Sequence, residues 1–238
     1  MNTPQPKVTI IIPIYNEEGI LAAAINDLVD RLNSLNWSYE LVLAENGSSD
    51  RTVEIARELS QRHSQLSFFS IGEPNYGKAL RKGILEAKGE YVFCDEIDLC
   101  DTDFYTRAMV ILQSDKADFV VGSKLSEGAN DKRPFIRHAG SLVINAMLRV
   151  SLGFRGTDTH GLKAFRRDRL IEVARSCIVD RDLFASEFVI RSERLGIQIE
   201  EIPVSILEKR APSTTIYRRV PNVLLNLAKL VVAIRFKG

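Results

Sequence analysis

Cysteines, histidines and long apolar runs are all scarce in this sequence of 238 residues. The three cysteines, Cys94, Cys100 and Cys177, form no CxxC pair, and only three histidines accompany them. An odd number of unpatterned cysteines argues against a disulfide framework or a zinc site and is typical of a reduced, cytosolic chain. Positive and negative side chains nearly balance, at 32 Lys and Arg against 31 Asp and Glu, so no overall charge attracts nucleic acid.

Segments that would target or anchor the chain are also lacking. Residues 1–7 do not have the charged and then apolar pattern of a signal peptide. No uncharged apolar run approaches the about 20 residues that a membrane-spanning helix needs. Internal repeats, low-complexity tracts and Pro/Gly-rich linkers are absent as well. With 45% hydrophobic and 26% charged residues, we expect one well-packed globular domain that does not cross a membrane.

A regular alternation of strand and helix patterns fills the first half of the chain. Continuous β-branched or apolar runs predict strands at 8–14, 39–44, 66–71, 91–94 and 118–122. Helical periodicity lies between them at 17–35, 51–62 and 77–88. We expect Asp50 to cap the start of the second helix and Gly89 to cap the end of the third. This alternation predicts an α/β, Rossmann-like fold with a mostly parallel central sheet flanked by helices.

Polar groups follow three of the predicted strands. They are Tyr15-Asn16-Glu17, Glu45-Asn46-Gly47-Ser48 and Asp95-Glu96-Ile97-Asp98. Ligands of parallel α/β sheets bind beyond the carboxyl ends of the strands. We therefore expect a binding site at that edge of the sheet.

The acidic segment after the fourth strand is the first candidate for chemistry. Asp95, Glu96 and Asp98 lie close together, and Asp101 and Asp103 follow them. Clustered carboxylates repel one another and are typical ligands of a hard cation such as Mg²⁺ or Mn²⁺. Glu96 and Asp98, two positions apart in extended chain, project to the same side and form a natural pair of ligands. A solvated acidic loop in which an aspartate caps the next helix explains the same residues equally well.

The segment 72–79 (GEPNYGKA) offers a rival interpretation. Its GxxxxGK spacing between a strand and a helix nearly matches a P-loop. However, Ala79 stands where a Ser or Thr would hold Mg²⁺, and Pro74 lacks a backbone N–H that would contact phosphate. These two defects disfavour an ATP or GTP hydrolase. Lys78 beside a helix N-terminus still suits a diphosphate, with a solvated surface lysine as the alternative.

Several segments together resemble the family 2 glycosyltransferases. In chain order they are 8–18 (VTIIIPIYNEE), 45–52 (ENGSSDRT), 75–78 (NYGK) with 87–91 (AKGEY), 158–167 (DTHGLKAFRR), 184–196 and 201–204 (EIPV). The block at 158–167 resembles the one typical of dolichol- or polyprenyl-phosphate sugar synthases. The resemblance covers about residues 8–213 and implies the GT-A nucleotide-diphosphosugar transferase fold.

The chain departs from the family pattern at three places. Glu45-Asn46 stands where the family usually has Asp-Asp, a change that affects the contacts to base and ribose. Counted from Tyr91 without a gap, the Asp-x-Asp metal motif becomes Glu96-Ile97-Asp98, with Asp95 before it as an alternative to Glu96. Lys124 replaces the usual Arg of a Gly-Ser-Arg segment, which exchanges a bidentate fork for a point charge.

The resemblance implies roles for individual residues. Nucleotide-sugar contacts would come from Pro13, Tyr15, Glu17, Glu45, Asn46, Lys78 and Arg210. Contacts to an acceptor phosphate would come from Lys124, Arg137 and Ser141. Glu96 and Asp98 would hold Mg²⁺ or Mn²⁺ on the donor diphosphate, and the catalytic set would be Asp98, Glu96 and Asp95. Glu187 is either a base for a hydroxyl acceptor or, as we favour, a structural partner of Arg191.

The implied reaction is the metal-dependent, inverting transfer of a hexose from a GDP- or UDP-sugar to a polyprenyl or dolichyl phosphate. A lipid phosphate is already anionic, so it needs no strong general base, and positioning with charge stabilisation supplies most of the acceleration. Two alternatives stay open. One is transfer to a lipid or saccharide hydroxyl. The other is a non-catalytic nucleotide-sugar-binding domain, which the replacement of aspartates at 45, 46 and 96 suggests.

Two amphipathic stretches predict contact with a membrane surface. In 221–236 the residues Asn222, Asn226 and Lys229 form a narrow polar stripe, and cations flank an otherwise apolar helix. Such a helix is about 24 Å long, shorter than a hydrocarbon core about 30 Å thick. The stretch 138–152 is the second, and the alternative is that both pack on the sheet or on a partner subunit. We expect a glycosyltransferase domain at 1–215, an interfacial helix at 216–238, and a cytoplasmic protein that is peripheral on the inner face of the membrane.

Overall fold

The computed structural model describes residues 5–131, 135–206 and 220–236, with side chains described at 5–129, 140–181, 183–205 and 225–235. Strands and helices alternate along most of this length. The elements are β1 (Val8–Ile14), α1 (Leu21–Ser34), β2 (Tyr39–Glu45), α2 (Thr52–Arg62), β3 (Leu66–Ser70), α3 (Tyr76–Glu86), β4 (Tyr91–Cys94), α4 (Thr102–Gln113), β5 (Phe119–Ser123), β6 (Asn130–Asp131), α5 (Phe135–Leu152), β7 (Lys163–Arg166), α6 (Arg167–Ser176), η1 (Arg181–Leu183), α7 (Phe184–Arg194), β8 (Ile199–Pro203), β9 (Ser205–Ile206) and α8 (Val220–Phe236).

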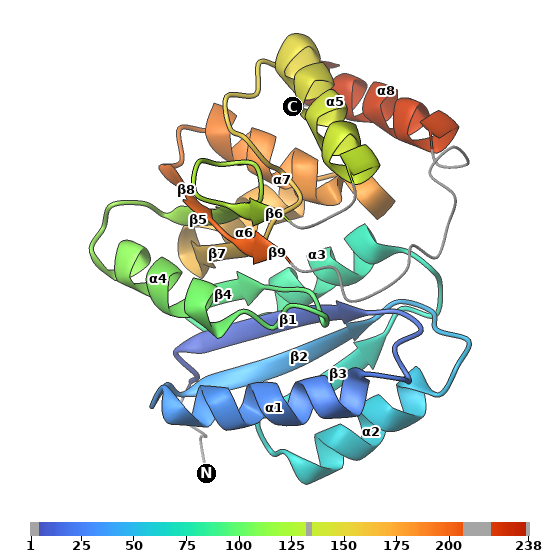
Figure 1. Ribbon diagram of the computed structural model, residues 1–238, viewed down its shortest axis with the longest axis vertical. Helices are drawn as coiled ribbons and strands as arrows, with labels where there is room; N and C mark the ends of the chain where they lie inside the picture. Colours follow the sequence, from blue (N-terminus) through green and yellow to red (C-terminus); the bar gives the residue numbers. More distant parts are fainter. Residues whose placement is uncertain (1–4, 132–134, 207–219, 237–238) are drawn as a thin grey trace.

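The central sheet has seven strands in the order β3-β2-β1-β4-β7-β5-β8 (Figure 1). Every strand except β7 runs in the same direction, because β7 pairs antiparallel with both β4 and β5. The predicted α/β fold with a mostly parallel sheet is confirmed. The antiparallel β7 places its first residue, Lys163, opposite Cys94 and Val121. The carboxyl ends of the parallel strands and the beginning of β7 therefore share one edge.

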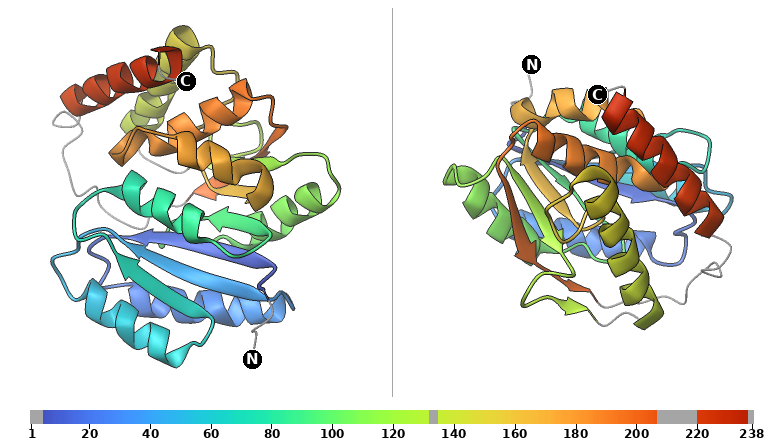
Figure 2. Two further views of the ribbon diagram at one scale, coloured as in Figure 1. Left: turned by 180° about the vertical axis from the view of Figure 1, so that it is seen from behind. Right: turned by 90° about the horizontal axis from the view of Figure 1, so that it is seen from above.

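Helices cover both faces of the sheet (Figure 2). On one face, α1, α2 and α4 pack into a core cluster that includes Leu28, Leu59 and Phe104. On the other face, α3, α6 and α7 pack into a second cluster that includes Leu80 and Phe188. The strand β1 is buried along its whole length and is apolar except for Thr9, since a strand covered on each side has no solvent-facing positions.

The predicted strand bounds agree closely with the structure, whereas one helix begins later than predicted. The strands predicted at 8–14 and 91–94 coincide with β1 and β4. Helix α1 begins at Leu21 rather than at residue 17, because the chain after β1 forms a turn in which Asn16 has a positive φ of 54°. That turn lies at the edge where the site was predicted.

The predicted C-cap role of Gly89 is wrong. Helix α3 ends at Glu86 with Ala87 as its C-cap residue. Gly89 instead allows a close approach to β1, since a Cβ atom there would lie 2.5 Å from the backbone nitrogen of Thr9. Its own N–H donates to the Thr9 hydroxyl at 2.8 Å.

Asp50 was predicted as the N-cap residue of α2, but it lies one residue before the N-cap position. Arg51 is the N-cap residue of this helix and makes no side-chain cap. The Asp50 carboxylate accepts the N–H of Thr52, the first helical residue, at 3.0 Å and the N–H of Glu18 at 3.1 Å. Asp50 therefore joins the helix to the turn after β1.

Helices α5 and α8 pack side by side at one end of the molecule (Figures 1 and 2). Through one side, α8 buries Leu230, Ala233 and Ile234 in the second core cluster. Asn226, predicted on an open polar stripe, is also buried. Within the described ranges, no helix is both long enough and apolar enough to span a membrane. The predicted domain boundary at 215/216 lies outside the described residues.

Arginines of α7 connect the ends of α5 and α8 to the domain. Arg194 donates to the carbonyl of Ile234 in α8 at 3.2 Å and to that of Leu152 in α5 at 3.0 Å. Arg191 donates to the carbonyl of Ala233 at 3.3 Å. The last carbonyls of a helix have no partner within the helix, so these bonds satisfy them and fix the position of both helices.

Candidate functional site

Loops at the carboxyl ends of β1, β2 and β3 are joined to one another. The N–H of Asn16 donates to the Ser48 hydroxyl at 3.0 Å, and the Asn16 side chain accepts the N–H of Ser49 at 2.8 Å. Gly47 has a φ of 82°, and a Cβ atom there would lie 2.5 Å from the backbone carbon of Glu73. Only glycine combines that conformation with such a close approach. The loops therefore form one continuous rim along the edge.

The first strand supplies the residues predicted to contact the nucleoside. Pro13 is buried within β1, where it pairs with Ala44 of β2. Tyr15 follows the strand and is 44% exposed. The N–H of Glu17 donates to the Thr52 hydroxyl at 2.7 Å. These three residues do lie at one edge, with Tyr15 the most open of them.

Glu45 and Asn46, at the end of β2, are both buried and hold the rim in place. The Glu45 carboxylate accepts the N–H of Ser48 at 2.5 Å and also the Ser70 hydroxyl. Asn46 donates its side-chain N–H to the carbonyl of Ile14 at 3.0 Å. Both residues lie where the sequence predicted, and their described contacts are to the protein itself.

The acidic segment divides into structural and open carboxylates. Asp95 is 2% exposed and accepts the N–H of Glu96 at 2.6 Å, the N–H of Asp101 at 2.9 Å and the hydroxyl of Tyr105 at 2.5 Å. Burial raises the pKa of Asp95 to about 7, although these hydrogen bonds act in the opposite direction. Asp101 caps α4 by accepting the N–H of Phe104 at 3.0 Å. The capping interpretation therefore holds for Asp101, and Asp95 organises the loop.

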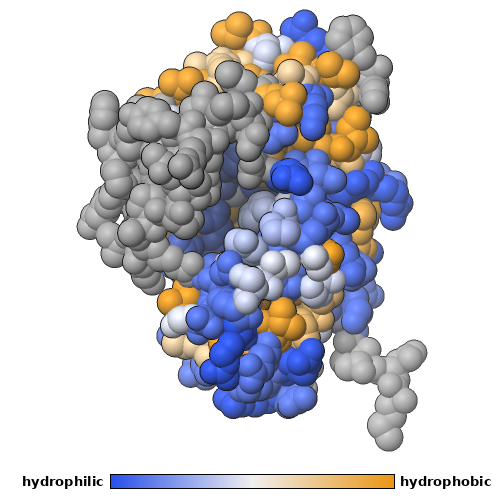
Figure 3. Space-filling model, turned by 90° about the vertical axis from the view of Figure 1, so that its right-hand side faces the viewer, coloured by the Kyte–Doolittle hydropathy of each residue, from blue (hydrophilic) through white to orange (hydrophobic). Residues whose placement is uncertain are grey.

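Glu96 and Asp98, unlike Asp95, are reached by solvent. Glu96 is exposed and Asp98 is half-buried. Desolvation raises the pKa of Glu96, and the charge of Asp98 raises it further, while Lys124 and Lys163 act against both. The strand β1 points toward the right of Figure 1, and Figure 3, which views that side, shows a hollow with a hydrophilic lining.

Two buried lysines, Lys124 and Lys163, lower the pKa of Glu96 by their charge. Lys124 is 9% exposed, and its ammonium group lies 3.2 Å from Asp158, which is 2% exposed. Lys163, also buried, donates to the carbonyl of Gly161 at 2.7 Å. Burial lowers the pKa of Lys163, whereas the charges of Asp158 and Glu96 act in the opposite direction. Lys124 and Asp158 thus form a buried ion pair, and both lysines act on the pKa of Glu96.

Lys78 lies at the start of α3, as predicted, and forms an ion pair. Its ammonium group is 2.5 Å from Glu73, and both side chains are about half exposed. The pair lies at the surface, where ion pairs contribute little to stability.

Three predicted residues receive limited or no description. Arg210 lies outside the described residues, and Arg137 belongs to α5 but its side chain is not among those described. Ser141 is half-buried on α5. Within the described part of the chain, no group of three or more His, Cys, Asp or Glu side chains surrounds a possible metal position.

Glu187 has the structural role that we favoured. It is fully buried, accepts the N–H groups of Ile178 at 2.9 Å and Val179 at 2.6 Å, and pairs with Arg191 at 2.7 Å. Both carboxylate oxygens are engaged, so the side chain is not available as a base.

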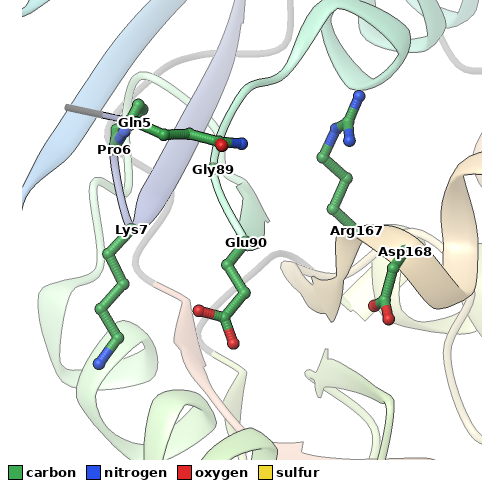
Figure 4. Close-up of a pocket in the computed structure, with 7 residues that line it drawn as sticks. All are labelled: Gln5, Pro6, Lys7, Gly89, Glu90, Arg167 and Asp168. Atoms are coloured by element: carbon green, nitrogen blue, oxygen red, sulfur yellow. The ribbon is translucent and has the colours of Figure 1, made fainter. Parts of the chain in front are cut away.

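A cavity of about 440 Å³ lies at the opposite edge of the sheet (Figure 4). Lys7 and Glu90, which directly precede β1 and β4, line it together with Arg167 and Asp168. Ligands of α/β sheets bind at the other edge, beyond the carboxyl ends of the strands. The cavity is therefore separate from the candidate site.

The sequence of this domain matches the model of a known family. Residues 9–174 match the model of Glycosyl transferase family 2. The chain belongs to glycosyl transferase family 2.

The family 2 domain has relatives that act on lipid phosphates. It is 30% identical over 218 residues to a dolichyl-phosphate beta-glucosyltransferase of Trichomonas vaginalis, covering 84% of this chain and 66% of the relative. It is 29% identical over 175 residues to an undecaprenyl-phosphate 4-deoxy-4-formamido-L-arabinose transferase of Photorhabdus laumondii, covering 72% of this chain and 52% of the relative. The chain thus spans about half to two thirds of the length of these relatives.

Solved structures confirm the GT-A fold of the family 2 domain. Glucosyl-3-phosphoglycerate synthase from Mycobacterium tuberculosis in complex with UDP superposes with a TM-score of 0.65 at 18% identity, covering 95% of this chain and 80% of that one. The same enzyme with Mn²⁺, UDP and glucosyl-3-phosphoglycerate gives a TM-score of 0.63 at 15% identity, over 96% and 78% of the two chains.

The sequence did not single out two residues that act on the pKa of Glu96 or are acted on by its charge. Lys163 and Tyr76 both lie within the electrostatic reach of Glu96. In the sequence, each belongs to a segment that resembles the family, 75–78 or 158–167. The pairing of Lys163 with Cys94 across the antiparallel β7 depends on strand order, which local patterns do not reveal.

Proposed function

We propose that this domain transfers a hexose from a GDP- or UDP-sugar to a polyprenyl phosphate. Family membership and the lipid-phosphate relatives support glycosyl transfer of this kind. The observation that carries the proposal is the pair of open carboxylates, Glu96 and Asp98, beside buried cations at the carboxyl edge of the sheet. In the reaction, an acceptor oxygen bonds to the anomeric carbon as the bond to the nucleoside diphosphate breaks, with inversion.

The residues present fit a divalent cation. Glu96 and Asp98 supply oxygen ligands, and Mg²⁺ or Mn²⁺ in such sites takes one or two carboxylates together with substrate phosphates. A complete protein cage is therefore not required, in keeping with the lack of a three-ligand cluster among the described residues. When bound, the cation would neutralise charge on the departing diphosphate. Mn²⁺ and UDP in related synthase crystals support this choice. Lys78, with Arg210 as a further candidate, would contact the same phosphates.

The acceptor is better explained as a phosphate than as a hydroxyl. A hydroxyl acceptor needs a base, and Glu187 is fully engaged by Arg191 and two backbone N–H groups. A phosphate oxygen is already anionic and needs only to be positioned. We assign Lys124, Arg137 and Ser141 to that task. Lys124 would share its charge between Asp158 and the incoming phosphate.

An acceptor assay tests this proposal. Purified domain, Mn²⁺ or Mg²⁺ and radiolabelled UDP- or GDP-hexose are incubated with a short, water-soluble prenyl phosphate or with the matching prenyl alcohol. We expect glycosyl-phosphate product to form from the phosphate at least about 100-fold faster than glycoside forms from the alcohol, because the alcohol needs general-base catalysis, which contributes about that factor. Product from the alcohol alone would favour the hydroxyl-acceptor alternative. No product with either acceptor, although the nucleotide-sugar binds, would favour a binding module.

We further propose that α5 and α8 rest on the cytoplasmic face of an anionic membrane. Their apolar surface consists of the exposed residues Leu142, Val143, Val150, Leu225 and Val232. Val150 is 87% exposed and Leu225 is 57% exposed, and apolar residues gather at this end of the molecule in Figure 3. The exposed cations Arg149, Lys229 and Arg235 accompany them on the same helices. Apolar groups with adjacent cations suit the interface of anionic lipids.

Substitution of the apolar surface tests membrane contact without removing α8, which contributes Leu230 and Ile234 to the core. In Val143→Ser/Val150→Ser/Leu225→Ser, we expect binding to phosphatidylglycerol vesicles to fall about tenfold or more, because each apolar side chain contributes about 1 kcal/mol or more when inserted. Vesicle sedimentation measures this. Val110→Ser is the matched control, since Val110 is 67% exposed on α4. Equal sedimentation of the triple variant and the wild type would refute membrane contact.

A further inference from the structure

Thr157, in the segment between α5 and β7, joins three elements that lie apart in the sequence. Its backbone N–H donates to the carboxylate of Glu201 in β8 at 2.7 Å, and its hydroxyl donates to the same carboxylate at 2.6 Å. The hydroxyl also lies 2.6 Å from that of Ser123, the last residue of β5. The carbonyl of Thr157 accepts the side-chain N–H of Asn145 in α5 at 2.8 Å. The threonine therefore links β8, β5 and α5.

The Glu201 carboxylate fixes the direction of the hydrogen bonds in this network. An ionised carboxylate only accepts hydrogen bonds, so the Thr157 hydroxyl gives its one proton to Glu201. The Ser123 hydroxyl then has to donate its own proton to Thr157, and its lone pairs are left to accept. They accept the N–H groups of Leu125 and Ser126, each at 3.1 Å. The charge of Glu201 thereby determines how Ser123 holds the turn after β5.

Lys124 is enclosed by that turn. It lies between Ser123, whose hydroxyl accepts, and the two residues whose N–H groups donate, so the direction of its backbone is fixed. In the sheet, only β7 separates β5 from β4, whose end leads into the acidic segment. Lys124 directly follows β5, so it lies at the carboxyl edge of the sheet, as the acidic segment does.

We propose that Glu201 is a positioning residue for the acceptor: acting through Thr157 and Ser123, it holds Lys124 where its charge meets the acceptor phosphate. This inference rests on the proposed function, which assigns Lys124 to that phosphate. A turn that is fixed in advance reduces the ordering cost of binding. The network should therefore contribute to acceptor affinity. It should not contribute to donor affinity, because its hydrogen bonds join β5, β8 and α5, whereas the proposed nucleoside contacts belong to β1, β2 and the loops after them.

The network extends to the helix that carries the other two proposed acceptor contacts. Asn145 is 5% exposed and belongs to α5, as do Arg137 and Ser141. Its hydrogen bond to Thr157 attaches α5 to the segment that Glu201 holds. A phosphate contacted from two elements requires that these elements keep a set separation, and the network provides it.

The variants Glu201→Gln and Thr157→Val test the assignment, because each keeps the shape of the side chain. In either orientation, the amide of Glu201→Gln turns an NH2 group toward a donor of Thr157, and Thr157→Val removes the hydroxyl. Initial rates are measured with the short prenyl phosphate and the nucleotide-sugar that the wild type uses. We expect KM for the prenyl phosphate to rise about tenfold, as for loss of a hydrogen bond to a charged group. The kcat and KM for the nucleotide-sugar should stay unchanged, as for a loss of acceptor binding alone.

Two further variants serve as controls. Thr157→Ser keeps the hydroxyl and should keep the wild-type KM for the prenyl phosphate. Thr9→Val is the matched substitution elsewhere: the Thr9 hydroxyl also donates to a glutamate, Glu40, at 2.6 Å and accepts a backbone N–H, but it lies near the amino end of β1. Both KM values of Thr9→Val should equal those of the wild type.

An unchanged KM for the prenyl phosphate in either Glu201→Gln or Thr157→Val, whichever folds, overturns the inference. An equal rise in KM for the nucleotide-sugar also overturns it, because the loss is then one of general structure. The same holds if Thr157→Ser is as impaired as Thr157→Val, since the hydroxyl is then irrelevant. Absence of product from the wild type with the prenyl phosphate refutes the proposed function instead.

Discussion

Asp98→Asn is expected to lower kcat/KM for sugar transfer by about a thousandfold or more, since metal stabilisation of a leaving group contributes several kcal/mol. The substitution preserves shape and removes the negative charge that a hard cation requires. Asp98 is half-buried, and its charge raises the pKa of Glu96, two residues earlier in the chain. Initial rates measured across a range of Mn²⁺ and Mg²⁺ concentrations check this expectation.

Asp103→Asn is the control for that experiment. Asp103 belongs to the same acidic stretch but is exposed in the first turn of α4, 2.8 Å from Arg107. The variant makes the same change in charge and should keep the wild-type rate. If Asp98→Asn retained full metal-dependent activity, the assignment of Glu96 and Asp98 as cation ligands would be wrong.

Lys124→Met is expected to lower the free energy of unfolding by about 3–5 kcal/mol, the usual effect of removing one partner from a buried ion pair. Lys124 is 9% exposed and Asp158 is 2% exposed, so the substitution leaves a carboxylate inside the protein without its cation. Urea denaturation at pH 7 measures the change. Adding Asp158→Asn in the same chain should recover part of the loss, because the uncompensated charge is then gone.

The effect of Lys124→Met should depend on pH. Burial by itself would raise the pKa of Asp158, but the charge of Lys124 and the N–H of His160 outweigh it, so that this pKa lies below its ordinary value. The stabilisation is therefore present above the ordinary aspartate pKa of about 4 and is lost as pH falls through the folded-state value. The difference in stability between wild type and variant should shrink below about pH 4.

An exposed pair provides the comparison for this stability measurement. Arg175→Met breaks an ion pair with Glu172 in which both side chains are more than half exposed. We expect its effect to be about 0–1 kcal/mol. Equal effects of Lys124→Met and Arg175→Met would contradict the view that burial makes the Lys124–Asp158 pair important.

The central strands and their edge were predictable because they depend on local pattern. β1 is apolar except for Thr9, and β4 ends where the acidic residues begin. These features are properties of neighbouring residues, and they placed Tyr15, Glu45 and Glu96 at the carboxyl edge. The family segments added the expected GT-A fold, which the solved structures confirm.

The different roles of the acidic residues were not predictable from local pattern. Asp95, Glu96, Asp98 and Asp101 are chemically similar in the sequence, yet one organises a loop, one caps α4 and two remain open. What separates them is which backbone N–H groups and hydroxyls lie within reach. Gly89 was not predictable for the same reason, because the atoms that exclude a side chain there belong to β1, which is distant in the sequence.

By itself, the sequence determined the α/β alternation, the polar edge and the family, because periodicity and motif spacing are recorded along the chain. The tertiary structure alone decided that Asp158 and Lys163 join Glu96 there, and that Glu187 is engaged within the core. The reason is that the antiparallel β7 returns a distant segment to the edge between β4 and β5. Burial and ion pairing depend on contacts between residues that are far apart in the sequence, and local sequence patterns do not reveal these contacts.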